Sequence, residues 1–433
     1  MHTDRPNILY IHSHDTGRYV QPYGHAVATP NIQRLAEEGI LFRQAFCTAP
    51  TCSPSRASLL TGQYAHSAGM FGLAHRGFAL NDYRQHLIHT LRKAGYYAAR
   101  VGEEHIAKVV GTVGYDYVAP LESTHAAVVA PTAISLLRDK LPEPFFLSVG
   151  FAETHRAYPP SDAREASYTL PPAPLPDTPE IRQDMAAFKA SARELDRGIG
   201  EVLTALEQTG LAENTLVICT TDHGLAFPRM KGFLTDSGIG VMLIIRGPGG
   251  FTGGKVCDAQ VSQIDIFPTL CDLLGIDYPS WLQGQSLLPL IHDETDQLHE
   301  AVFAEVNYHA SYEPKRAVRT KRWKYIRRFD DRSELILPNV DDSPTKDFLL
   351  ERGWQQHSRP LEALYDLVFD PTEAHNLVDD SAMSEILQDM RTKLETWMHE
   401  TNDPLLHGPI PAPVGAELND PDQISPEEPT HVV

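Results

Sequence analysis

Short apolar segments that each end in polar or charged residues constrain the fold of this chain more than any other feature. Residues 7–11 run into His12-Ser13-His14-Asp15, and residues 216–221 run into Asp222-His223-Gly224. Three further segments follow the same pattern: 96–101, 145–151 and 241–245. Apolar runs of this length are typical of strands that are buried on both faces of a mostly parallel sheet.

Helical patterns lie between these predicted strands. Residues 31–38 follow Thr29-Pro30, a suitable cap and first turn, and residues 185–207 carry an apolar stripe. Alternating strands and helices predict an α/β fold, with a large, mixed, mostly parallel sheet between helices. Because functional groups gather at the carboxyl ends of such strands, we expect the polar clusters to form one composite site.

The pattern changes after residue 290. Residues 301–306, 316–320 and 323–329 are predicted to be antiparallel strands, and a helix is predicted over residues 383–400. The tail from Asn402 is rich in proline and acidic residues and is expected to be irregular. We therefore predict a catalytic domain over residues 1–290 and a smaller α+β domain with an irregular tail over residues 291–433.

Composition limits the partners and the location of the protein. The 433 residues carry a formal net charge of -20, and no basic block offsets it, so we expect no nucleic-acid partner. The five cysteines show no spacing typical of a disulfide framework or a zinc ribbon. No apolar run reaches membrane-spanning length and no signal region is visible, so we expect no membrane association. A cytoplasmic location follows, or a periplasmic or secreted one if a leader was removed.

The segment Cys52-Ser53-Pro54-Ser55-Arg56, followed by Leu60-Thr61-Gly62, is the most specific motif. It has the form Cys-x-Pro-x-Arg with Leu-Thr-Gly after it, and it resembles the signature of the type I sulfatases. In that family a formylglycine-generating enzyme oxidises the cysteine to formylglycine, whose hydrate is a nucleophile that regenerates itself. The alternative is a buried structural cysteine, since free cysteine is among the most buried residue types.

The resemblance to sulfatases extends over nearly the whole chain. Arg5-Pro6-Asn7 resembles the first strand of the family, Thr220-Thr221-Asp222-His223-Gly224 its later metal-binding turn, and Leu364-Tyr365-Asp366 its C-terminal motif. Gly69-Met70-Phe71-Gly72-Leu73 and Phe227-Pro228 are similar to segments of heparan N-sulfatase (sulfamidase)-like members. The resemblance implies an alkaline phosphatase-like fold and hydrolysis of a sulfate ester or sulfamate.

The resemblance also implies one divalent metal at the site. Sulfatases typically use Asp-Asp and Asp-Asn pairs around calcium, whereas this chain has His14-Asp15 and Asp222-His223. Imidazole suits manganese, zinc or iron, and calcium prefers oxygen ligands. We therefore predict a metal bound by His14, Asp15, Asp222 and His223 beside Cys52, with Mn²⁺ favoured and Ca²⁺ as the alternative. The alternatives are a helix cap or turn residue for Asp15 and Asp222, and for His14 and His223 a histidine that does not bind the metal itself.

Four further residues match catalytic positions of the family. Arg56 would fix the formylglycine, His105 and His155 would contact the nucleophile and the leaving group, and Lys231 would bind the transferred group. Histidine suits proton transfer near neutral pH. The alternatives are a structural ion pair for Arg56, satisfied core histidines, and a solvated lysine.

Glu103 departs from the family, which usually has lysine at this position. A carboxylate beside a sulfate group is repulsive, so Glu103 binds metal, pairs with a cationic group of the substrate, or turns away. Tyr308 and His309, with Arg316 and Arg319, are candidates for substrate recognition in the second domain, and ordinary strand residues are the alternative.

These features lead to one principal prediction and two alternatives. We predict a formylglycine-dependent sulfatase that acts on a small anionic sulfate or sulfamate, with a sulfated sugar as one candidate. A phosphonate monoester or phosphodiester hydrolase on the same scaffold is the first alternative, and a binding protein without catalysis is the second. A homo-oligomer is compatible with the sequence, which does not identify the substrate.

Overall fold

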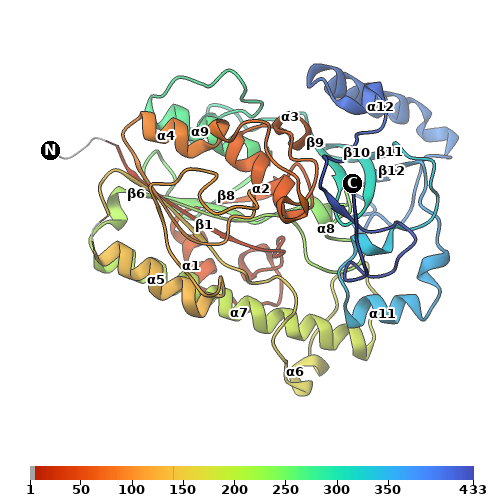
Figure 1. Ribbon diagram of the computed structural model, residues 1–433, viewed down its shortest axis with the longest axis horizontal. Helices are drawn as coiled ribbons and strands as arrows, with labels where there is room; N and C mark the ends of the chain where they lie inside the picture. The colour runs from red at the N-terminus through yellow and green to blue at the C-terminus, as the bar shows by residue number, and fades with distance from the viewer. Residues whose placement is uncertain (1–4, 140) are drawn as a thin grey trace.

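The computed structural model describes residues 5–139 and 141–433 and contains two main sheets (Figure 1). The larger sheet has eight strands in the order β4-β3-β5-β1-β6-β7-β2-β8. Its strands are β1 (Asn7–Ser13), β2 (Ile40–Phe46), β3 (Tyr97–Gly102), β4 (Tyr117–Val118), β5 (Phe145–Gly150), β6 (Thr215–Thr221), β7 (Leu243–Arg246) and β8 (Lys255–Ser262). All neighbours pair in parallel except β7, which runs antiparallel to β6 and β2. The predicted mixed, mostly parallel sheet is confirmed.

Helices cover both faces of the larger sheet, as the alternation of the sequence predicts. Helices α1 (Pro30–Glu38), α5 (Ala126–Arg138) and α7 (Pro179–Gln208) pack on one face, below the sheet in Figure 1. Helices α2 (Cys52–Thr61), α4 (Leu87–Lys93) and α9 (Ile266–Leu274) pack on the other face. Alternate residues of β1 enter the two cores: Ile8 and Tyr10 contact one, and Leu9 and Ile11 contact the other. This double burial explains why the strand is apolar throughout.

The predicted elements of the larger sheet agree with the structure, and three strands were missed. Strands β2, β4 and β8 were not predicted from the sequence. Arg43 and Gln44 interrupt the apolar run of β2, β4 has only two residues, and the first five residues of edge strand β8 are exposed or partly exposed. None of the three therefore has the continuous apolar run by which the others were recognised.

The smaller sheet has four antiparallel strands in the order β12-β11-β10-β9. They are β9 (Ala301–Tyr308), β10 (Tyr312–Thr320), β11 (Trp323–Arg328) and β12 (Glu362–Asp366). Helix α12 (Ser384–Glu400) covers one face, where Val318, Tyr325 and Leu364 pack against it. The opposite face turns toward the larger sheet, and Arg319 and Lys324 there form ion pairs with Asp236 of α8 (Asp236–Ile239).

The C-terminal segment is irregular but hydrogen-bonded to the rest of the protein. It contains only the short pair β13 (Glu417–Leu418) and β14 (His431–Val432) after residue 410. Asn419 is buried, accepts a hydrogen bond from Arg76, and donates its backbone N–H to Ala310. Across residues 5–139 and 141–433, no helix combines the length and apolar character needed to cross a membrane.

Candidate active site

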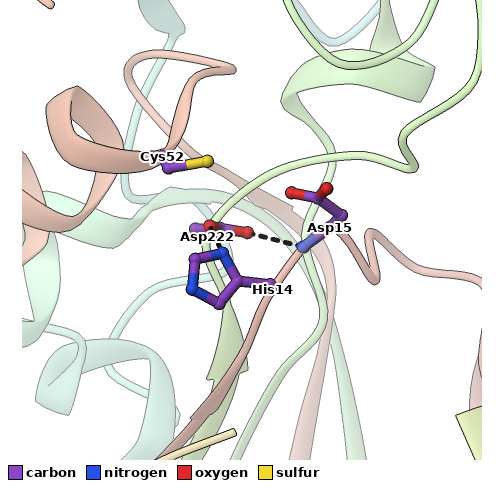
Figure 2. A group of neighbouring side chains, drawn as sticks. All are labelled: His14, Asp15, Cys52 and Asp222. Carbon is purple, nitrogen blue, oxygen red and sulfur yellow. Dashed lines mark hydrogen bonds and ion pairs between the residues drawn. The ribbon is translucent and has the colours of Figure 1, made fainter. Parts of the chain in front are cut away.

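The polar clusters at the ends of β1 and β6 meet the first turn of α2, as Figure 2 shows. The two strands are neighbours in parallel register, with His12 opposite Thr220, so their carboxyl ends lie together. One ligand atom from each of His14, Asp15, Cys52 and Asp222 lies within 4.8 Å of the others, and all four residues are buried. Imidazole Nε2 of His223 lies 3.3 Å from Asp15 Oδ1 and 3.6 Å from Asp222 Oδ2. The structure thus brings together all five residues predicted to surround the metal, and we call these five residues the metal-capable group.

The donors of this group suit a divalent cation. The structure holds two carboxylates and two imidazoles in a buried space, and the buried atoms His14 Nδ1 and Asp15 Oδ1 make no hydrogen bond with the described residues. Unsatisfied buried polar atoms are costly, and a cation would satisfy both. Mixed nitrogen and oxygen ligands suit a first-row transition metal better than calcium.

Asp222 is the most connected member of the group. Its carboxylate accepts hydrogen bonds from the backbone N–H of Asp15 at 2.8 Å and of His223 at 2.9 Å. Arg56 donates to it at 3.0 Å, and Nδ1 of His14 lies 3.2 Å away. Burial by itself would raise the pKa of Asp222, but His223, Arg56 and His14 hold this pKa well below its ordinary value. Asp222 is therefore an anion at neutral pH.

Cys52 is the first residue of α2 and lies at the positive end of the helix. Every residue of α2 is buried, which fixes the position of the side chain. Its Sγ lies 3.4 Å from Nε2 of His223. Burial raises the pKa of the Cys52 thiol well above its ordinary value, although Lys231 opposes this effect. An unmodified thiol here is protonated and a poor nucleophile.

Arg56 lies one turn after Cys52 and joins α2 to both strands. Its guanidinium contacts Nδ1 of His12 at 2.6 Å and donates to the carbonyl of Ser13 at 2.8 Å, besides its bond to Asp222. These contacts join Arg56 to Asp222 and to the end of β1. Arg56 therefore holds Asp222 in place through a buried ion pair, which was its structural alternative. Its expected contact with a formylglycine at position 52 stays a prediction.

Lys231 is buried between two carboxylates beside the group. Its Nζ is 3.0 Å from Asp15 Oδ2 and 3.0 Å from Asp341 Oδ2. Burial by itself would lower the pKa of Lys231, but Asp15 and Asp341 raise it well above its ordinary value, so the side chain is a cation. Asp341 was missed in the sequence, because it lies in an irregular segment far along the chain that carries no recognisable motif.

The two predicted histidines both lie near His14, and the ring centroid of His155 is 5.6 Å from that of His14. His155 Nε2 lies 3.5 Å from Lys231 Nζ and 4.0 Å from Asp15 Oδ2, and 43% of its side chain is exposed. The His105 ring lies 6.1 Å from that of His14, and its Nε2 is 2.7 Å from Nδ1 of His75. Burial and the neighbouring His14 lower the pKa of His105 well below its ordinary value, so this imidazole is neutral.

Glu103 lies outside the metal-capable group. Its Oε1 accepts a hydrogen bond from the backbone N–H of Glu104 at 3.2 Å, and its side chain lines a cavity of about 450 Å³ together with His105. Glu104 is buried and forms ion pairs with Arg100 and His86. Of the three alternatives, this placement fits a carboxylate turned away from the metal ligands, and it leaves a contact with a cationic substrate group open.

The four candidates for substrate recognition in the second domain differ in their positions. Tyr308 is buried in the core and donates its hydroxyl to the carbonyl of Ile410 at 2.7 Å, so the structure does not bring it to the site. His309 is buried with its Nδ1 3.0 Å from the carbonyl of Asn339, and burial and the charge of Lys231 lower its pKa to about 3. Arg316 is fully buried against Asp403, and Arg319 pairs with Asp236, so neither is a free residue of the strand surface.

Comparisons with known proteins show what this chain resembles. The sequence pattern of the sulfatase family matches residues 6–276, and that of the N-sulphoglucosamine sulphohydrolase C-terminal region matches residues 223–351. The chain is 31% identical to human N-sulphoglucosamine sulphohydrolase, over 93% of this chain and 92% of the relative.

Two solved structures share the fold. A protein bound to its substrate D-glucosamine-2-N,6-O-disulfate superimposes with a TM-score of 0.73 at 20% identity, over 92% of this chain and 99% of that one. The phosphonate monoester hydrolase of Agrobacterium radiobacter superimposes with a TM-score of 0.69 at 21% identity, over 92% and 96%.

Proposed function

Because this chain belongs to the sulfatase family, whose members hydrolyse sulfate esters or sulfamates, we propose that it removes sulfate from a sulfated sugar. The proposal includes formylglycine made from Cys52 as the nucleophile, and a divalent metal held by His14, Asp15, Asp222 and His223. A bound metal would neutralise charge on the sulfuryl oxygens and orient the nucleophile.

The observation that carries the proposal is the position of Cys52. A motif cysteine at the start of a fully buried helix points into a group of two carboxylates and two imidazoles, with Lys231 beside it. The unmodified thiol is protonated there and is poorly suited to attack. A hydrated aldehyde in the same place offers two hydroxyl groups to the same surroundings.

The reaction has two covalent steps. One hydroxyl of the hydrate attacks sulfur and loses its proton, while the bond from sulfur to the sugar oxygen or nitrogen breaks and the leaving group takes up a proton. The second hydroxyl then loses its proton, the carbon–oxygen double bond re-forms, and sulfate leaves. Water adds to the aldehyde and restores the hydrate.

The positions of the histidines suggest how the protons are divided between them. His155 is exposed at the mouth of the site beside Lys231, where it would donate to the leaving sugar. His105 is neutral and bonded to the exposed His75, so it would accept the proton of the hydrate and pass it toward solvent. The ammonium group of Lys231 would bind an oxygen of the transferred sulfuryl group.

The choice of a sugar rests on the relatives. The human relative is named as an N-sulphoglucosamine sulphohydrolase, and one structure of the same fold holds a disulfated glucosamine. Both N-sulfated and O-sulfated glucosamine are therefore the first substrates to test.

The test uses protein from a host in which the mass of the Cys52 peptide proves the modification. Initial rates are measured with glucosamine N-sulfate, glucosamine 6-sulfate, an aryl sulfate, an aryl phosphonate monoester and an aryl phosphodiester. We expect a sulfated sugar to have the highest kcat/KM and Cys52→Ala to be inactive. If protein with modified Cys52 hydrolyses none of the sulfur substrates, the proposal is wrong.

A phosphonate monoester or phosphodiester hydrolase is the second candidate. Two observations favour it: the Asp222-His223 pair beside Cys52, and a glutamate at position 103 where sulfatases usually carry a sulfate-binding lysine. The same substrate panel separates the two, because a preference of several orders of magnitude for the phosphorus esters would replace the first proposal. Unmodified Cys52 with no hydrolysis of any substrate would instead indicate a binding protein.

A further inference from the structure

A cavity of about 420 Å³ lies where the smaller sheet faces the loop that follows β6. Its walls are the sheet, Arg229 and residues 233–235 of the loop, residues 174–176, and the segment around Trp354. None of the metal-capable residues, His105, His155 or Lys231 lines it. The cavity is thus separate from the proposed active site.

One face of the smaller sheet forms the floor of this cavity. Residues alternate across a strand, and paired residues of neighbouring strands share a face. Lys315 is opposite Arg328, and Ile326 is opposite Ala363, and all four line the cavity. Helix α12 covers the other face, and the cavity lies over this part of the sheet.

The cavity is cationic in a protein of net charge -20. Four cationic side chains line it, Arg229, Lys315, Arg328 and Arg359, and the only carboxylate among the lining residues is Glu313. Glu313 pairs with Lys315 at 2.8 Å and with Arg359 at 3.2 Å. Asp330, behind the wall, pairs with Arg328 at 3.0 Å and with Arg359 at 2.9 Å. Two carboxylates therefore form ion pairs with three cations, and Arg229 adds a fourth positive charge.

Arg229 is the cation with no partner of its own. Across residues 5–139 and 141–433, its guanidinium makes no hydrogen bond or ion pair, while its carbonyl accepts a bond from Thr235. Its backbone has a φ of 68°, a left-handed conformation that is unfavourable for a residue with a Cβ. Strained backbone of this kind persists where the surrounding structure imposes it, and it is common at ligand contacts.

The remaining walls are apolar and aromatic. Leu175, Phe233, Leu335, Trp354 and Tyr365 line the cavity beside the cations. Aromatic rings with apolar faces and nearby cations match a sugar ring, which has apolar C–H faces, when that ring carries a carboxylate or a sulfate group. A cavity of this volume is within the range of small-molecule sites.

We propose that this cavity is a second binding site, for an anionic sugar unit, with Arg229 as its anion contact and Trp354 and Phe233 as its apolar walls. The anionic character of the ligand follows from the cationic side chains that line the cavity, and the choice of a sugar rests on the proposed function. Burial lowers the pKa of Lys315 although Glu313 opposes this effect, and a bound anion would offset that cost.

The loop between the cavity and the active site links the two. Arg229 and Phe233 line the cavity, whereas Lys231 between them pairs with Asp15. The carbonyl of Gly232 accepts a hydrogen bond from Lys315, and its N–H donates to Pro50, two residues before Cys52. A ligand in the cavity therefore contacts the loop that holds a proposed sulfuryl-binding residue.

The test measures binding independently of turnover, so it stands apart from the test of the proposed function. Tryptophan fluorescence is followed during titration with glucuronate and glucosamine 6-sulfate, and Trp354→Phe identifies the signal from the cavity. We expect saturable binding that Arg229→Gln weakens about tenfold, the size of effect for one charged hydrogen bond. The matched control is Arg352→Gln, an exposed arginine that does not line the cavity and is expected to leave affinity within twofold.

Three results would overturn the inference: no signal that depends on Trp354, equal affinities of parent and Arg229→Gln, or equal binding of uncharged N-acetylglucosamine. Inorganic sulfate that binds as tightly as the sugars would reduce the site to one for free anions and would also overturn it. Kinetics distinguish the two possible sources of the bound sugar. If Arg229→Gln raises the KM for sulfated oligosaccharides but not for an aryl sulfate, the cavity binds another unit of the substrate chain. If the KM is unchanged for both, the cavity binds a separate molecule.

Discussion

Replacing Asp222 by asparagine tests the centre of the proposed site. Asparagine keeps the shape of the side chain and an oxygen for the N–H of Asp15, but it removes the charge that faces Arg56 at 3.0 Å and His14 at 3.2 Å. Because the surrounding cations hold the pKa of Asp222 well below its ordinary value, the folded protein favours the charged form. Neutralising the residue must therefore destabilise the fold.

The magnitude follows from burial. Arg56 and Asp222 are both almost completely inaccessible, so the change leaves an arginine buried without its carboxylate. Removing one partner of a buried pair costs about 3–5 kcal/mol. The unfolding entropy of a chain of 433 residues is about 0.9 kcal/mol per kelvin for unfolding in one transition, so Tm falls by about 3–6 °C.

The first assay is thermal unfolding in the presence of a chelator, so that the loss of the ion pair is measured without any effect of metal binding. The second assay is metal analysis of protein purified without chelator. The control is Asp258→Asn, since Asp258 is 69% exposed beside Arg43 and its change is expected to cost less than about 0.5 kcal/mol. We also expect Asp222→Asn to lose bound metal and activity. The reasoning is refuted if this variant unfolds with the parent in chelator, or if it retains stoichiometric metal.

Four further predictions follow from the same structure. Cys52→Ala lowers kcat about 10⁴-fold or more while the Tm stays near that of the parent, and turnover by this variant would contradict the proposed nucleophile. Chelation abolishes activity and Mn²⁺ restores it better than Ca²⁺; stoichiometric calcium as the sole metal in protein purified without added metal would show the preference to be wrong. Glu103→Gln changes kcat/KM for an aryl sulfate less than about threefold, since its carboxylate lies outside the metal-capable group, and a hundredfold loss would place it in the reaction. Burial by itself would raise the pKa of Glu305, but His66 and Arg316 lower this pKa to about 2. The charged carboxylate therefore stabilises the fold at pH values above the pKa of glutamate in the unfolded chain, and this stabilisation is lost as the pH falls toward 2. Glu305→Gln should therefore cost about 3 kcal/mol at pH 7 and progressively less between pH 4 and pH 2 in thermal unfolding, and a pH-independent difference would refute the assignment.

The sequence by itself determined the parts of this protein that depend on neighbouring residues. Continuous apolar runs identified β1, β3, β5, β6 and β7, because a strand buried on both faces must be apolar at every position. The polar residues directly after β1 and β6 identified His14, Asp15, Asp222 and His223, since the ends of parallel neighbours meet. The cysteine motif was recognisable because its residues are consecutive.

Only the tertiary structure decided which distant side chains meet. Asp341 reaches Lys231 through an irregular segment without a motif, and Tyr308 turns into the core while the adjacent His309 contacts the carbonyl of Asn339. The cationic cavity is assembled from the loop after β6, three strands of the smaller sheet and the segment around Trp354. No periodicity or spacing in the sequence encodes such contacts, because they depend on how whole elements pack against one another.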